Sequence, residues 1–156
     1  MKKLCFIFIF LLALLLIISM KTQTAFAQTL NLTILDSTIS FADRDPDLQS
    51  SITATPNPVR VSVRVRNNAG NNWRLTHQAS GDLSSSIPIS NISWTVTPQP
   101  PFVNGSMSRL APQTAAQGVG NQNPAVTGRF TFTIANLWSY NTGNFSQTTT
   151  FTLSAP

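Results

Sequence analysis

"VRVSVRVR", residues 59–66, alternates valine with arginine or serine without a break. Successive side chains of a β-strand point to opposite faces of a sheet, so this alternation places four valines on one face and the polar residues on the other. Valine is β-branched, which favours a strand. The stretch therefore predicts a strand in a sheet that has one apolar face and one wet face.

The same two-residue period recurs along the chain, and no segment shows sustained helical periodicity. Alternating stretches are "TLNLTIL" (29–35), "ISWTV" (92–96), "RFTFTI" (129–134) and "TFTLSA" (150–155), and in 73–80 the residues Trp73, Leu75, His77 and Ala79 share one face. Turn signals separate them: 43–47, 55–58, 67–72, 80–82, 97–101, 103–105 and the long polar stretch 113–128. The pattern predicts eight or nine short strands in a single all-β, immunoglobulin-like antiparallel β-sandwich.

The first 27 residues read as a secretory signal peptide. Lys2 and Lys3 precede an apolar run over 5–20, and Ala25-Phe26-Ala27 fits a cleavage site. The run is shorter than the roughly 20 residues of a comfortable membrane span. We expect cleavage after Ala27, a β-sandwich domain over 28–156 with no membrane span, and a location outside the cell or in its envelope.

Charge and cysteine content narrow the function classes. All three lysines and the only cysteine, Cys5, lie in the predicted signal peptide, whereas the seven arginines and five aspartates lie in 28–156, so the net charge there is 7 − 5 = +2. Nucleic-acid binding would need a denser basic patch. The exported domain has no disulfide to hold it and must rely on its core. We expect no nucleic-acid partner and no cofactor.

The chain contains few residues of the types that catalyse reactions. His77 is the only histidine, residues 28–156 contain neither Cys nor Glu, and no Gly-x-Ser-x-Gly element is present. Asp82 is the nearest carboxylate to His77 in sequence. A catalytic histidine needs a nucleophile and an orienting group, so we predict no catalytic residues and interpret His77 as a strand residue on the apolar side.

Two groups of charged residues are candidates for binding. Asp43, Asp45 and Asp47 alternate and would offer oxygen ligands to a hard cation such as calcium, although the stretch lacks the EF-hand spacing; the alternative is a solvated loop. Arg60, Arg64 and Arg66 share one face of their strand and would bind an anionic polymer; the alternative is a solvated face that discourages edge pairing. Exposed tryptophans would stack on sugars. Trp73 and Trp94 fit core packing, whereas Trp138, near a turn, fits either the core or the surface.

Two stretches resemble a known family. "NNWRLTHQASGDL" (71–83) is similar to the first Trp-x-Leu motif of bacterial WxL surface domains, and "TGNFSQTTTFTLSAP" (142–156) resembles their closing segment, with Phe151-Thr152-Leu153 in place of a second Trp-x-Leu. The chain also resembles pilin-like and spore-coat-like exported β-sandwiches. The WxL resemblance implies non-covalent attachment to the cell wall or to other surface proteins, with Trp73 and Leu75 as the residues that carry over.

The sequence thus predicts an exported, non-enzymatic structural or adhesive protein of the bacterial surface. Its expected partners are a cell-wall polymer or other surface proteins. Self-association is also expected if "TLNLTIL" donates a strand to a neighbouring subunit of a polymer. A carbohydrate- or calcium-binding module is the other alternative.

Overall fold

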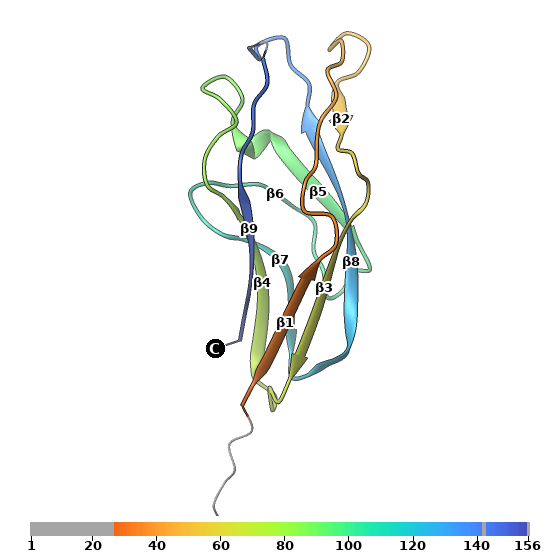
Figure 1. Ribbon diagram of the computed structural model, residues 1–156, viewed down its shortest axis with the longest axis vertical. Helices are drawn as coiled ribbons and strands as arrows, with labels where there is room; N and C mark the ends of the chain where they lie inside the picture. The colour runs from red at the N-terminus through yellow and green to blue at the C-terminus, as the bar shows by residue number, and fades with distance from the viewer. Residues whose placement is uncertain (1–26, 142, 156) are drawn as a thin grey trace, which may run out of the picture.

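The computed structural model describes residues 27–141 and 143–155 (Figure 1), so the predicted signal peptide lies outside the described residues except for Ala27. The strands are β1 (Thr29–Ile34), β2 (Ser51–Thr53), β3 (Val59–Arg66), β4 (Asn72–Ala79), β5 (Ile92–Thr97), β6 (Gly105–Ser106), β7 (Gln113–Val119), β8 (Gln122–Ala135) and β9 (Thr149–Ser154). A single 3₁₀ turn spans Ile89–Asn91. In this part of the chain we find no helix with the length and apolar character of a membrane span.

The strands form two antiparallel sheets. The larger has the order β1-β3-β8-β5-β6, with β2 paired to the far end of β8, and the smaller has the order β7-β4-β9. Strand β8 is long enough to pair with β3 through its first half and with β2 through its last residues, while β5 lies on its other side. The predicted all-β sandwich is confirmed.

The core lies between the two sheets and follows the alternation in the sequence. The four valines of β3 are buried, and its arginines point outward. Trp73, Leu75, His77 and Ala79 of β4 are all buried as well, which confirms their predicted common face. Large rings from the larger sheet complete the packing: Trp94, Phe130 and Phe132. The hydrophobic core thus extends across both sheets.

The polar stretch 113–128 was predicted to be a connection, and this prediction is wrong. It forms β7 and the first half of β8, joined by a turn in which Gly120 has a positive φ of 73°. Its glycines lie against core rings: Gly118 pairs with Trp73 across β7 and β4, and a Cβ at Gly118 would lie 2.6 Å from the indole. A Cβ at Gly128 would lie 2.8 Å from Phe102. Glycine in a strand allows such close approach.

Strand β1 exists as predicted, but its apolar side is not well covered. Only Leu32 is half-buried, while Leu30 and Ile34 are 37% and 39% exposed. The reason is position, since β1 is the outermost of the described strands of the larger sheet and pairs with β3 alone.

Candidate functional site

An arginine face covers the outer side of β3 and β8 in the larger sheet. Alternation in β3 turns Arg60, Arg64 and Arg66 away from the buried valines. Strand β8 lies beside β3 (Figure 1) and places Arg129 directly opposite Arg60. We define Arg60, Arg64, Arg66 and Arg129 as the arginine face. It holds four of the seven arginines of the chain.

The charges of this face are only partly balanced within the protein. Arg60 forms an ion pair with Asp36 at 3.5 Å, and Arg64 donates to the amide oxygen of Asn123 through Nε at 3.1 Å and Nη2 at 3.0 Å. Within 27–141 and 143–155, Arg66 and Arg129 form no ion pair. Like charges directly opposite on neighbouring strands destabilise a sheet, so the Arg60 and Arg129 pair favours an anion bound between them.

The Trp-x-Leu residues occupy the core. Trp73 is 2% exposed and Leu75 is fully buried, because both lie on the inner side of the central strand of the smaller sheet. Neither side chain is at the surface of the folded protein, so their placement supports core packing over direct contact with a partner. The two stretches that carry the family resemblance are neighbours in this sheet, with Leu75 opposite Leu153 and His77 opposite Phe151.

His77 sits among aromatic rings. Its imidazole stacks on Phe151 with a centroid distance of 3.8 Å and an interplanar angle of 6°, and Trp94 and Phe132 lie at 5.5 and 5.8 Å. Nε2 is 2.9 Å from Oγ1 of Thr149, whereas the buried Nδ1 has no hydrogen-bond partner. Burial lowers the pKa of His77 from 6.5 to about 4.

This environment is poor for general-base chemistry. Thr149 supplies a hydroxyl at hydrogen-bond distance, but an imidazole with so low a pKa is a weak base near neutral pH. The carboxylate of Asp82 does not orient the ring, since it accepts from the backbone N–H of Ile89 at 2.9 Å and pairs with Arg109 at 2.8 Å. The contacts of His77 are those of a core residue.

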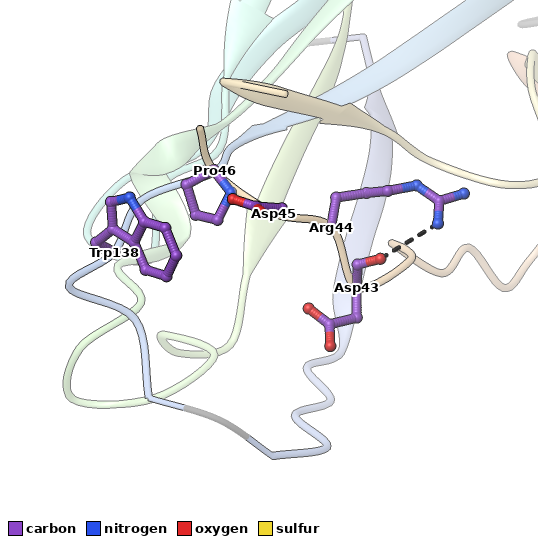
Figure 2. Close-up of a pocket in the computed structure, with 5 residues that line it drawn as sticks. All are labelled: Asp43, Arg44, Asp45, Pro46 and Trp138. Atoms are coloured by element: carbon purple, nitrogen blue, oxygen red, sulfur yellow. Dashed lines mark hydrogen bonds between the residues drawn. The ribbon is translucent and has the colours of Figure 1, made fainter. Parts of the chain in front are cut away.

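A second candidate lies at the end of the sandwich where the loops after β1 and β8 meet. Residues 43–46 and Trp138 line an open hollow of about 320 Å³, and Figure 2 shows how these side chains lie. Trp138 is 69% exposed, and its Nε1–H donates to Oδ1 of Asp47 at 3.0 Å. Asn136 joins the two loops by donating to the carbonyl oxygens of Arg44 and Gln49, both at 2.9 Å. The indole is thus exposed and held in place.

The three aspartates of this loop do not form a cation site. Oδ1 of Asp45 accepts from the backbone N–H of Asp47 at 2.9 Å, and Oδ1 of Asp47 accepts from Trp138. No group of three acidic, histidine or cysteine side chains suited to a metal ion occurs in the described part of the chain. The carboxylates of Asp45 and Asp47 instead order the loop around the exposed indole.

The sequence does not point to Arg129, and it does not decide whether Trp138 is buried or exposed. Arg129 belongs to the arginine face only because the register of β3 and β8 places it opposite Arg60, and that register depends on long-range pairing. Trp138 is 69% exposed because the loop after β8 is held against the loop after β1, where the indole donates to Asp47. Comparison of the chain with protein-family models, curated proteins and solved structures finds no match.

Proposed function

We propose that this protein is an exported, non-enzymatic component of the bacterial cell surface that adheres to an anionic polymer of the cell wall through the arginine face. The observation that carries the proposal is the direct opposition of Arg60 and Arg129, with Arg64 and Arg66 on the same face. Guanidinium groups pair well with phosphate and carboxylate. Residues two apart along a strand are spaced by about 6.8 Å, so Arg64 and Arg66 present charges at a repeat that an extended polyanion can follow.

The predicted signal peptide and the WxL resemblance support the same role, since both point to a protein displayed outside the cell. In this proposal Trp73 and Leu75 stabilise the smaller sheet from within. The adhesive contacts belong to charged side chains on the opposite, outward side of the larger sheet. Binding should therefore weaken as salt screens these charges.

Co-sedimentation with isolated bacterial cell walls tests the proposal. We expect the protein to pellet with walls at low salt and to remain in solution at about 0.5 M salt, where exposed charges are strongly screened. The double substitution Arg64→Gln with Arg129→Gln should reduce pelleting at least tenfold. The double substitution Arg74→Gln with Arg109→Gln is the matched control, because both are exposed arginines outside the arginine face and their loss removes the same two charges.

The same experiment distinguishes the arginine face from a second candidate, a saccharide site on Trp138. A fixed, exposed indole beside carboxylates suits the apolar face and the hydroxyls of a sugar ring. Pelleting that persists in high salt and is lost in Trp138→Ala would favour that site over the arginine face. Pelleting that depends on neither set of residues would contradict both.

A further inference from the structure

Among the residues that the structure describes, no strand pairs with the outer edge of β1. The N–H of Leu35 donates to the carbonyl of Arg60 at 3.0 Å, and β1 is antiparallel to β3. Hydrogen-bonded and non-bonded residues alternate in such a pair, so Thr33, Asn31 and Thr29 bond toward β3. The N–H and C=O groups of Leu30, Leu32 and Ile34 therefore face away from the sheet, along its free edge.

The side chains at this edge are apolar or neutral. Leu30, Leu32 and Ile34 point toward the inner side, opposite the buried Val65, Val63 and Val61. Strand β9 contacts β1 on the same side of the sandwich, with Phe151 and Leu153 half-buried. Natural edge strands usually carry charges or prolines that prevent pairing, and β1 has neither.

We propose that the edge of β1 docks a second copy of this protein, with the two β1 strands antiparallel across a two-fold axis through Leu32. Leu32 then faces Leu32 of the second copy, and Leu30 faces Ile34, because paired residue numbers add to 64. Asn31 faces Thr33 on the outer side. Each free backbone group at Leu30, Leu32 and Ile34 gains a partner, and the apolar row continues across the axis.

Charge favours a second copy as the occupant. A charged residue near a two-fold axis meets its own copy and is repelled, and all six residues of β1 are uncharged. Farther from the axis, Asp36 lies beyond the end of β1, where it pairs with Arg60 of its own copy at 3.5 Å. The strand that would meet its own copy is therefore free of charge along its whole length.

The area buried between the two copies is that of a weak dimer. Standard interfaces bury about 800 Å² per partner with 20–30 residues, or roughly 35 Å² per residue. The six residues of β1 with Phe151, Leu153 and their flanks give about 350 Å² per copy, or about 700 Å² in total, which is below the range of stable interfaces and in that of weak, transient contacts. We expect a dissociation constant between about 10 µM and 1 mM. Such a dimer forms where the protein is concentrated, as on a surface.

Sedimentation velocity of the exported protein between about 10 µM and 1 mM tests the proposal. We expect a reversible shift from monomer to dimer over this range. Thr33→Lys adds a charge on the exposed side of β1 beside the axis and should abolish the shift. Thr95→Lys, at an exposed position on the outer side of β5 inside the same sheet, should leave it unchanged.

A second variant tests the register without relying on repulsion. Residues 28–156 contain no cysteine, so Leu32→Cys supplies one thiol at the axis, and mild oxidation should yield a covalent dimer. Thr95→Cys should stay monomeric under the same oxidation. A monomer at every concentration, or association equally sensitive to both lysine substitutions, overturns the proposal. So do oligomers that grow beyond dimers, which would point to open-ended strand donation.

Discussion

At the scale of single residues, His77 links the packing of the core to pH. Burial lowers its pKa from 6.5 to about 4, so between these values the unfolded chain binds a proton that the folded chain does not. Stability therefore falls as the pH drops from about 6.5 toward 4, and His77 adds no further loss below that. The difference between the two pKa values corresponds to about 3 kcal/mol. Urea unfolding at pH 7 and at pH 4 measures this loss.

The control for His77 is His77→Gln, which does not titrate and retains an amide that can bond to Thr149. The two proteins differ in no other ionisable group, so the difference between their pH profiles isolates His77. We expect the free energy of unfolding of the variant to change by about 3 kcal/mol less between pH 7 and 4. Parallel profiles for the two proteins would show that the buried imidazole does not carry the effect.

At the scale of strands, alternation of large side chains was enough to predict β3, β4, β5, β9 and the second half of β8. It failed for β7 and the first half of β8, where alanine, glycine and glutamine replace the usual strand residues. These segments are strands because Trp73 and Phe102 pack over Gly118 and Gly128, a contact between distant parts of the chain.

The candidate site, too, could be predicted from the sequence only in part. The two-residue period of β3 predicts that Arg60, Arg64 and Arg66 share one face. Arg129 belongs to this face because β8 pairs with β3 in a register that places it opposite Arg60. The free edge of β1 likewise depends on strand order, which no local pattern contains.

Gly118 of β7 faces Trp73, and this contact gives a prediction for the stability of the protein. A Cβ at Gly118 would lie 2.6 Å from Cε2 and Cζ2 of Trp73, so Gly118→Ala forces the indole or the strand to move. Overpacking of this kind costs about 1–3 kcal/mol, which chemical denaturation measures. Trp73→Phe removes the ring atoms in the way, and the loss on Gly118→Ala should be smaller in that background. Additive losses in the double variant would mean that the glycine is needed for another reason.

At the scale of the whole molecule, the three candidate binding surfaces lie on different parts of the sandwich. The arginine face lies on the outer side of the larger sheet, the exposed Trp138 at the loop end, and the unpaired edge along β1. A β1 dimer would extend the larger sheet and bring the arginine faces of both copies onto one continuous surface. Two weak polyanion contacts joined in this way would act together, so dimerisation and adhesion should reinforce each other.

The last prediction concerns the stability of the whole domain in the presence of a polyanion. A ligand that binds only the folded state stabilises it by about 2.7 kcal/mol at 100 times its dissociation constant. The unfolded chain has the same net charge but does not hold four guanidinium groups on one face, so long-chain polyphosphate should favour the folded state. For a domain of this size, Tm should rise by about 8 °C at low salt and hardly at all at about 0.5 M salt. Differential scanning fluorimetry should show nearly the full rise in the Arg74→Gln, Arg109→Gln double variant and at most half of it in the Arg64→Gln, Arg129→Gln double variant. An equally reduced rise in both double variants would mean that polyphosphate responds to net charge and not to the arrangement of the arginine face.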